Sequence, residues 1–423
     1  MKPKLLTTLE NYSLKLFWGD LFAGVTVAMV AMPLSLAIAI ASGASPEKGI
    51  VTAIIGGFLI SALGGSRFQI GGPTGAFIVV VYDVIANHGY DGLVLATFMA
   101  GIILLVSGVL RAGRLIAFVP EAVVNGFTIG IAVLIAFSQV KDLFGLSADH
   151  LPAAFFEKLP VLWQARASFS PAAFGLGAAT IACIVLLRRL APKLPGLIVA
   201  VAATSAAAAI MGGPVDTIAS RFGDLPNHLP APSLPAFTSY ERVLELLPSA
   251  FVIAFLAGVE SLLSAMVADK MSGDGRHRPN AEVLAQGAAN VGSALFGGLP
   301  ATGAIARTAT NIRAGGKTPM AGIVHALTIL IVMLIAAPLA GYLAMPALAG
   351  LLMITAWNMS EPHKWKAHFL EGRLSDRALL VTTLVLTVAT DLTIAIGVGV
   401  SLGLAIRLQR RHVPPAEWET PER

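Results

Sequence analysis

The sequence predicts an all-α integral membrane protein with fourteen transmembrane segments, built as two inverted repeats of seven and containing two half-helices that meet near the membrane midplane. Three observations support this fold class: the composition, a long series of apolar runs, and a pair of similar interruptions in the two halves. The chain is 56% hydrophobic and only 13% charged, with a mean hydropathy of +0.78. Soluble domains carry about 25% charged residues. A chain this apolar cannot bury its surface in one soluble globule, so it belongs in a bilayer.

Composition and motifs also exclude several classes of protein. The only cysteine, Cys183, lies in an apolar run, so the chain can form neither an internal disulfide nor a cysteine metal cluster. There is no P-loop, no HExxH pattern and no GxGxxG after a strand, which argues against an enzyme, a bound cofactor and an ATP-driven pump. The net charge of +5 is modest and indicates a positive cytoplasmic face rather than a nucleic-acid surface.

The apolar runs define the predicted helices, because a spanning helix needs about 20 mainly apolar residues. In the first half we expect helices at 21–42, 49–64, 74–87, 92–110, 122–141, 171–188 and 195–212. In the second half we expect helices at 245–268, 281–297, 302–314, 319–337, 340–358, 376–391 and 393–408. A polar, proline-rich stretch, 213–240, separates the halves, and the segments 74–87 and 302–314 are too short to span.

The distribution of basic residues predicts the orientation. If the N-terminus is cytoplasmic, most of the 29 Lys and Arg residues fall in the cytoplasmic segments. Membrane proteins place their excess of Lys and Arg on the cytoplasmic side. We therefore expect an inner (plasma) membrane protein with both termini in the cytoplasm.

Two similar interruptions mark the predicted binding site. They read Gly71-Gly72-Pro73-Thr74-Gly75-Ala76 and Gly297-Gly298-Leu299-Pro300-Ala301-Thr302-Gly303-Ala304. Pro or Thr after a glycine pair is a helix-start signal. A helix that begins inside a membrane presents unpaired N–H groups and a positive dipole end, which suit an anion. Paired interruptions indicate a transporter's binding site. The candidate substrate-binding residues are Thr74, Gly75, Ala76, Thr302, Gly303 and Ala304.

A second match supports the repeat. Phe22-Ala23-Gly24-Val25-Thr26 opens the first half, and Leu256-Ala257-Gly258-Val259-Glu260 lies at the matching place in the second. Chance similarity between small-residue helices is the alternative, because such helices are common in membranes. The joint occurrence of the break, the Pro or Thr and the glycine favours a repeat. Seven helices per unit is an odd number, so the second unit must be inverted relative to the first.

Arg307 is a candidate substrate-binding residue within the second short helix. It follows Gly303 by four positions and lies on the same helix face. Helical side chains lean toward the N-terminus, so the guanidinium can reach the place where the dipole favours an anion. Charged residues inside membranes are expensive and mark function. The alternative is a structural partner for Glu260 or a backbone carbonyl, and the two interpretations are compatible.

Glu260 is the candidate proton-coupling residue. It lies in the middle of an apolar helix, where desolvation favours the protonated carboxyl. Protonation would raise the local positive potential, so proton and anion would favour each other's binding. The alternatives are a static ion pair with Arg307, or a sodium ion held by Glu260 and nearby hydroxyls. Ser261 and Ser264 lie beside Glu260 and are predicted to line the cavity, whereas His325 is interpreted as a packing residue with satisfied ring nitrogens.

These segments together resemble the SulP anion transporters, also called solute carrier family 26. The resemblance covers nearly all of residues 15–410. It is carried by Asp20-Leu21-Phe22-Ala23-Gly24-Val25-Thr26-Val27 through Pro33, Gly72-Pro73-Thr74, Glu260-Ser261-Leu262-Leu263-Ser264-Ala265, Val267–Asp274, Asn280, Glu282, Gln286-Gly287, Asn290, Gly297–Pro300, Arg307–Asn311 and Gly315–Thr318.

The resemblance implies a division into a core (transport) domain and a gate domain, and a homodimer. The expected parts are core 1–110, gate 111–240, core 241–338, gate 339–410 and a cytoplasmic tail 411–423. The substrate site would lie between the third and tenth helices, with Glu260 and Arg307 at substrate or coupling positions. Relatives usually carry a cytoplasmic STAS domain after the last helix, and we expect none within the residues up to Arg423. Relatives also often have a polar residue where this chain has Leu34 after Pro33.

The expected function is secondary active transport of a small anion, namely a dicarboxylate, bicarbonate or sulfate, by proton-coupled symport and alternating access. The partners would be the anion, a proton and the lipid bilayer, with no nucleic acid. Alternatives are a sodium-coupled bicarbonate symporter, an anion exchanger or channel, and a nucleobase transporter of the same fold. Arg307 argues against the nucleobase transporter, and Glu260 against a passive channel.

Overall fold

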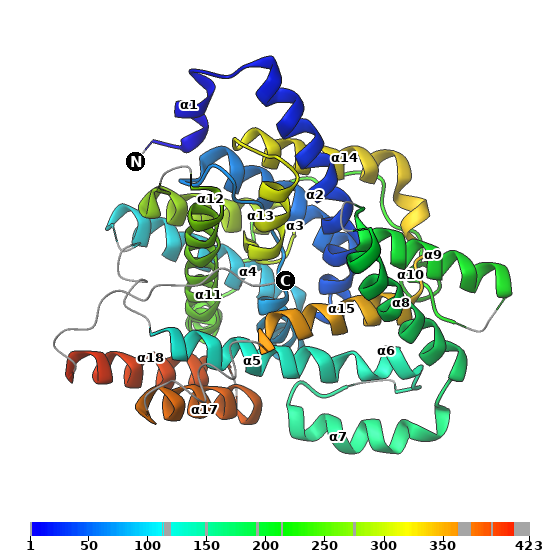
Figure 1. Ribbon diagram of the computed structural model, residues 1–423. Helices are drawn as coiled ribbons and strands as arrows, with labels where there is room; N and C mark the ends of the chain where they lie inside the picture. The colour runs from blue at the N-terminus through cyan, green and yellow to red at the C-terminus, as the bar shows by residue number, and fades with distance from the viewer. Residues whose placement is uncertain are drawn as a thin grey trace.

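Long apolar helices build the whole structure, a computed structural model that describes residues 2–111, 113, 120–148, 151–191, 194–212, 215–273, 276–362, 374–390 and 392–409 (Figure 1). The predicted tail 411–423 lies outside these residues. The first half contains α1 (Lys4–Leu9), α2 (Leu14–Ala41), α3 (Pro46–Leu63), β1 (Gly71–Gly72), η1 (Gly75–Phe77), α4 (Ile78–Val109), α5 (Glu121–Ser138), α6 (Val140–Phe144), α7 (Phe155–Gln164), η4 (Ala165–Ser168), α8 (Pro171–Leu190), α9 (Gly196–Met211) and α10 (Ile218–Phe222).

The second half repeats this order of long helices. It contains α11 (Tyr240–Ser272), α12 (Pro279–Leu295), β2 (Thr302–Gly303), α13 (Ile305–Arg313), α14 (Met320–Ala340), α15 (Met345–Met359), α17 (Leu374–Ala389) and α18 (Leu392–Gln409). Within the described residues, every predicted segment coincides with a helix or part of one. By length and composition alone, seven of the described helices could cross a membrane, and α9, α15 and α18 are shorter apolar helices.

The predicted segments 74–87 and 92–110 form one continuous run, η1 and α4, that is broken at Gly89. This residue has φ 71° and ψ 176°, which lies outside helical geometry. Glycine adopts such a backbone without the steric cost of a Cβ. The kink separates a short first half, which starts at the interruption, from a second half of ordinary length.

The helix packing has the two-fold symmetry that an inverted repeat requires. The counterparts in the two halves are α2 and α11, α3 and α12, α4 and α14, and α9 and α18. The contact between α4 and α12 then corresponds to the contact between α14 and α3. In the same way, α2–α3 corresponds to α11–α12, and α2–α9 corresponds to α11–α18. Likewise α8–α9 becomes α17–α18, and α5–α15 maps onto itself. Every one of these pairs packs together. The fold is therefore an all-α membrane fold of two inverted repeats.

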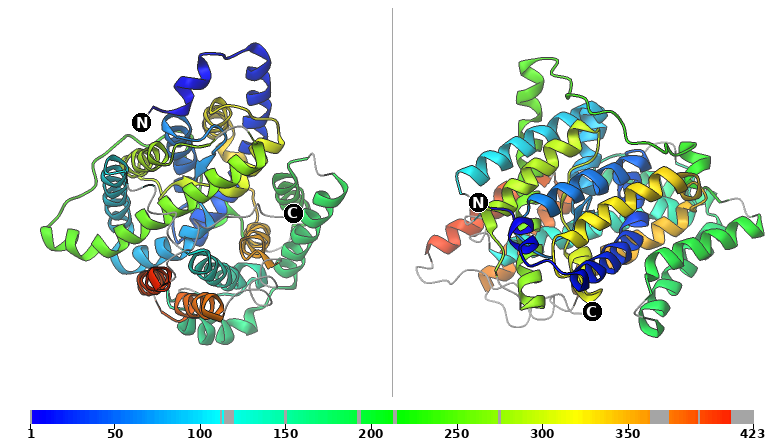
Figure 2. Two further views of the ribbon diagram at one scale, coloured as in Figure 1. Left: turned by 60° about the vertical axis from the view of Figure 1, so that its left-hand side comes forward. Right: turned by 90° about the horizontal axis from the view of Figure 1, so that it is seen from above.

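The helices also fall into two packing groups. The first comprises α2, α3, α4, α11, α12, α13 and α14, and the second comprises α5, α8, α9, α15, α17 and α18. Figure 1 and the left view of Figure 2 show α17 and α18, in orange and red, beside the teal helix α5. These groups match the expected core and gate parts in membership, but the division into two moving domains remains a prediction.

The two interruptions pair with each other as short antiparallel strands. Gly71 of β1 lies opposite Gly303 of β2, and Gly72 lies opposite Thr302. The predicted helix at 302–314 therefore begins at Ile305, because the two residues before Ala304 are extended. Strand pairing satisfies backbone groups that hydrocarbon cannot. It fixes the starts of the two short helices relative to each other.

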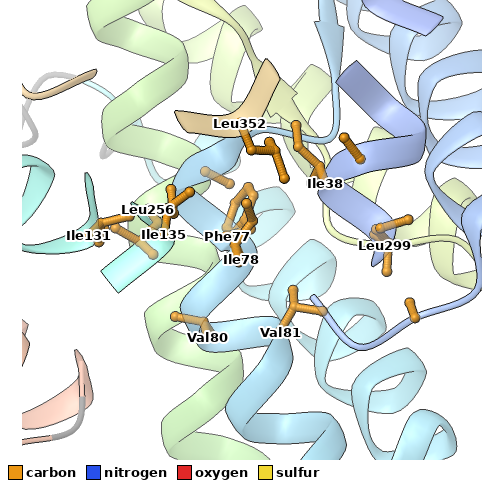
Figure 3. Packing of buried hydrophobic residues seen from close by; sticks show 14 of the residues in the cluster. Ile38, Phe77, Ile78, Val80, Val81, Ile131, Ile135, Leu256, Leu299 and Leu352 are labelled. Atoms are coloured by element: carbon orange, nitrogen blue, oxygen red, sulfur yellow. The ribbon is translucent and has the colours of Figure 1, made fainter. Parts of the chain in front are cut away.

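A tight apolar cluster holds the first of these starts in place (Figure 3). Phe77, at the end of η1, is 2% exposed and packs among Ile135 of α5, Leu256 of α11 and Leu352 of α15. Burying one such side chain contributes about 1.5–3 kcal/mol. The aromatic ring therefore anchors η1 at the junction between the two packing groups.

Candidate functional site

The strand crossing aims two helix N-termini at the same region. Thr74 is the N-cap residue of η1 and Ala304 that of α13, and neither has a side-chain cap. The first local bonds run from the Phe77 N–H to the Thr74 carbonyl, at 3.2 Å, and from the Thr308 N–H to the Ala304 carbonyl, at 2.9 Å. The N–H groups at 75–76 and 305–307 precede those bonds. Such first-turn groups have no partner within their own helix and can bind an anion.

The three predicted binding residues of the second half, Thr302, Gly303 and Ala304, make different contacts from Thr74, Gly75 and Ala76 in the first half. The Ala304 N–H donates to the Ile70 carbonyl at 2.9 Å, and Thr302 and Gly303 pair with β1. The Thr302 hydroxyl donates to the Ala257 carbonyl at 3.0 Å. These three residues shape the crossing. The next N–H groups along the chain, at Ile305 and Ala306, belong to the first turn of α13 and have no partner within that helix.

Exposure shows where the site is open. Ala306 is exposed, and Ala76 and Ile305 are half-buried, although their neighbours Gly75 and Arg307 are buried. A Cβ placed on Gly75 would lie 2.9 Å from Met359 Sδ and 3.5 Å from Ile135 Cδ1. Side chains of α5 and α15 therefore cover the N-terminus of η1, while the N-terminus of α13 is accessible.

Arg307 crosses from α13 to the first half of the chain. Its Nη2 donates to the Pro73 carbonyl at 3.0 Å and to the Ser35 hydroxyl of α2 at 3.2 Å. The side chain is 1% exposed. The predicted bond to a backbone carbonyl is present, and it joins the guanidinium to the peptide that precedes Thr74.

Glu260 faces the same region from α11. Its Oε2 accepts the Thr74 hydroxyl at 2.8 Å. Glu260 is half-buried, although the residues at 256–259 and 261–265 are all buried. Glu260 is therefore the partly exposed residue of this stretch of α11, and its carboxyl lies beside the N-terminus of η1.

Glu260 and Arg307 are near each other but form no salt bridge. The ion pairs among the described residues involve other side chains, while the two charges are close enough to interact electrostatically. The prediction of a static ion pair between them is therefore wrong in this structure. The positive charge of Arg307 remains available to a bound anion.

Ser261 and Ser264 do not line the site. Both are fully buried. Ser261 accepts the Gln69 amide at 2.7 Å, and Ser264 donates to the Thr308 hydroxyl at 3.0 Å. The prediction that they face the cavity is wrong because their positions on α11 turn them toward β1 and α13. They hold the crossing in place.

Several buried polar residues that support the site were part of the family resemblance but were given no role from the sequence. Glu282 of α12 accepts the Gly65 and Ser66 N–H groups at 2.8 and 3.0 Å, and so clamps the turn before β1. The Asn290 amide both donates to the Ala301 carbonyl and accepts the Ala301 N–H, at 2.8 and 3.0 Å. The sequence did contain a signal for this role: Glu282 and Asn290 are eight positions apart, so both lie on one face of an apolar helix.

Asp20 plays the same supporting role for the end of α13. It is fully buried and accepts the N–H groups of Lys317 and Thr318 at 2.7 and 3.1 Å. Tyr12 donates to the same carboxylate at 3.1 Å. Burial and the negative charge of Asp20 raise the pKa of Tyr12 to about 12. The turn after α13 is therefore tied to the start of α2.

Comparison with known proteins places this architecture in a family. Residues 17–382 match the model of the sulfate permease family. The Bacillus subtilis (strain 168) protein YvdB is 42% identical over 390 residues, which are 92% of this chain and 73% of that protein. The bicarbonate transporter BicA of Picosynechococcus sp. (strain ATCC 27264 / PCC 7002 / PR-6) is 30% identical over 410 residues, which are 93% of this chain and 70% of that protein.

Solved structures show the same fold. The transmembrane domain of a cyanobacterium bicarbonate transporter BicA superposes with a TM-score of 0.82 at 30% identity, covering 91% of this chain and 99% of that chain. Murine solute carrier 26 family member A9, in an inward-facing state, superposes with a TM-score of 0.85 at 16% identity, covering 96% of this chain and 71% of that one. The chain therefore belongs to the sulfate permease family and is a membrane anion transporter rather than an enzyme.

Proposed function

We propose that this protein is a secondary active transporter that carries a small anion together with a proton by alternating access. The anion would bind the first-turn N–H groups at 75–76 and 305–306, beside Arg307. The observation that carries this proposal is the arrangement of Glu260 and Arg307 around one strand crossing, close to each other and without a salt bridge.

Glu260 is the proposed carrier of the coupling proton. When its carboxylate is charged, it offsets the positive potential of Arg307 and of the two helix N-termini. Protonation removes that negative charge, so an anion then binds to a more positive site. The Thr74 hydroxyl holds the carboxyl 2.8 Å away, at the N-cap of η1, where its charge acts directly on the site.

The substrate class is a small oxyanion: bicarbonate, sulfate or a dicarboxylate. BicA is a bicarbonate transporter, and a Bos taurus relative, 28% identical over 409 residues, is a sodium-independent sulfate anion transporter. Two helix N-termini and one guanidinium supply several converging N–H donors. Such donors fit the several oxygens of an oxyanion better than a halide.

Sodium coupling is the second candidate, and one observation favours it. Ala257 and Glu260 lie on the same face of α11, and the Thr302 and Thr74 hydroxyls bond to them at 3.0 and 2.8 Å. One carboxylate, two hydroxyls and one carbonyl thus supply the oxygen ligands that a hard cation prefers. In this version, Na⁺ would replace the proton on Glu260.

The remaining alternatives are an anion exchanger, an anion channel and a nucleobase transporter. We further propose that the protein lies in the inner (plasma) membrane with both termini cytoplasmic, and that it forms a homodimer. The core comprises 1–110 and 241–338, the gate 111–240 and 339–410, and the core moves against the gate.

The experiment that tests the coupling is Glu260→Gln in proteoliposomes. The amide imitates the protonated carboxyl, so we expect the variant to bind and exchange the anion without stimulation by an inward proton gradient. Glu241→Gln, at an exposed site in the first turn of the same helix, is the control and should behave as the wild type. Gradient-stimulated uptake by Glu260→Gln would contradict the proton role.

A further inference from the structure

Four buried nitrogen atoms near the crossing have no hydrogen-bond partner in the protein. They are Nε and Nη1 of Arg307 and both ring nitrogens of His325. His325 lies on α14 and is fully buried, and Arg307 is 1% exposed. The partners that the sequence interpretation expected for the His325 ring nitrogens are therefore not protein atoms. An unmatched buried polar group carries a substantial free-energy cost, so two such side chains in one place require an explanation.

The imidazole and the guanidinium lie along the same stretch of α3. A Cβ placed on Gly57 would lie 3.6 Å from His325 Nδ1 and Cε1. A Cβ on Gly72 would lie 2.3 Å from Arg307 Nη1 and 3.5 Å from Ala53 Cα. Ala53 and Gly57 are one helical turn apart, on one face of α3. Both groups therefore lie against this face of α3, with the glycine strand β1 beside them.

The same space contains a backbone acceptor. Because the Ala304 N–H donates to the Ile70 carbonyl, the neighbouring Gly71–Gly303 pair is a pair without mutual hydrogen bonds. The Gly71 carbonyl consequently points away from β2, and its oxygen lies 3.1 Å from the Cβ position of Gly57. The pocket thus combines donors of Arg307, one donor and one acceptor of a neutral imidazole, and a carbonyl oxygen.

We propose that a buried water site joins His325 to Arg307, and that His325 is a positioning residue for the anion site. Water is the ligand because the pocket offers both donors and acceptors, and a buried water needs two to four such partners. Through this water, the imidazole holds Nη1 on the α3 side. Nη2 then remains aimed at Pro73 and Ser35. The role in anion binding rests on the proposed function, whereas the water site does not.

Two glycines let the guanidinium and the imidazole lie close to the backbone at this place. Gly72 has φ +147° and approaches Nη1 more closely than any side chain could, and Gly57 leaves the His325 ring uncovered. Gly56, one position earlier on α3, instead faces the Ala301 methyl group. The Gly57 face of α3, and not the Gly56 face, therefore lies against His325.

The first test is direct. A high-resolution structure of the full chain should show a water within hydrogen-bond distance of Arg307 Nη1 and a His325 ring nitrogen. A structure collected with bromide should show no anomalous signal there. A dry pocket, or a bromide ion in it, would overturn the proposal.

The second test separates a positioning role from a merely structural one. His325→Leu removes the polar bridge, and His325→Asn retains a donor and an acceptor. We expect the Leu variant to raise KM for sulfate uptake roughly tenfold with little change in kcat, and the Asn variant to restore most of the affinity. The control is Leu327→Ala, at an exposed position of α14, which should match the wild type.

Equal KM values in the wild type and both His325 variants would contradict the positioning role. If His325→Leu fails to fold, ¹⁵N spectra of histidine-labelled wild type, assigned with His325→Asn, decide the water site: at least one ring nitrogen should be hydrogen-bonded. A ring with two unbonded nitrogens would contradict it. Should the protein not transport sulfate or any other anion, the structure and the spectra still test the water site, so the two proposals can fail separately.

Discussion

At the scale of single residues, the site depends on charges that are held in place without being neutralised. Arg307 is fixed by a carbonyl and a hydroxyl, both of which are neutral acceptors. A carboxylate partner would have cancelled the potential that an anion requires. Glu260 is held by the neutral hydroxyl of Thr74 instead. The site can therefore change its net charge by one unit when Glu260 binds a proton.

Replacing Arg307 should weaken anion binding in proportion to what is removed. Hydrogen bonds to charged groups contribute about 1.5–3 kcal/mol, so Arg307→Ala should raise KM by at least roughly tenfold. Arg307→Lys retains the charge but cannot reproduce the planar guanidinium, and should be intermediate. The concentration dependence of uptake measures both. Arg313→Ala, at the exposed far end of α13, is the matched control, and an unchanged KM in Arg307→Ala would remove Arg307 from the site.

At the scale of elements, the crossing of β1 and β2 is the part that the sequence predicted least well. The hydrophobic lengths of the helices and the glycine-rich interruptions were visible, because burial in a membrane requires long apolar runs. The pairing of Gly71 with Gly303 was not, since two residues per strand give no alternating pattern. The sequence also did not show that the Ser261 side chain faces the protein interior rather than the cavity. A helix in a membrane protein is apolar on most sides, so the sequence does not indicate which side faces protein.

The crossing should tolerate no added side chain at Gly72. A Cβ there would lie 2.3 Å from Arg307 Nη1, on a backbone with φ +147°. We expect Gly72→Ala to cost about 1–3 kcal/mol in backbone strain and to displace the guanidinium. Lower thermal stability and a higher KM should appear together.

The matched control for that change is Gly175→Ala on α8. A Cβ at Gly175 would meet no atom within 4 Å. The control should therefore retain both the stability and the KM of the wild type. If Gly72→Ala behaved in the same way as Gly175→Ala, the crossing would not have the close contact with Arg307 that the structure shows.

At the scale of the whole molecule, the inverted repeat places one short helix from each half at a single site. This arrangement follows from the odd number of helices per repeat, which inverts the second repeat relative to the first. The matching contacts α4–α12 and α14–α3 have the symmetry that such a repeat requires. The expected division into core and gate follows the two packing groups. The proposed site would lie where the two packing groups meet, since Ile135 and Met359 of the second group cover Gly75 of the first.

Alternating access predicts that Ala306 changes its accessibility with substrate. The chain has one native cysteine, Cys183, so Cys183→Ala provides a background without thiols. Ala306→Cys in that background should react with a charged thiol reagent, because position 306 is exposed. A transported anion should slow the reaction.

A cysteine at the exposed loop position Leu234, outside the apolar helices, should react at a rate that the anion does not change. A rate at position 306 that is likewise insensitive to every anion tested would place the binding site elsewhere.

The central claim is that a proton gradient drives anion uptake, and one measurement tests it most directly. Wild-type protein in proteoliposomes is offered labelled bicarbonate, sulfate and a dicarboxylate, with and without an inward proton gradient, in the absence of sodium. Our account predicts that the gradient accelerates uptake and that one of these anions is clearly preferred. Uptake that ignores the proton gradient and requires sodium, or that ignores both, would contradict it.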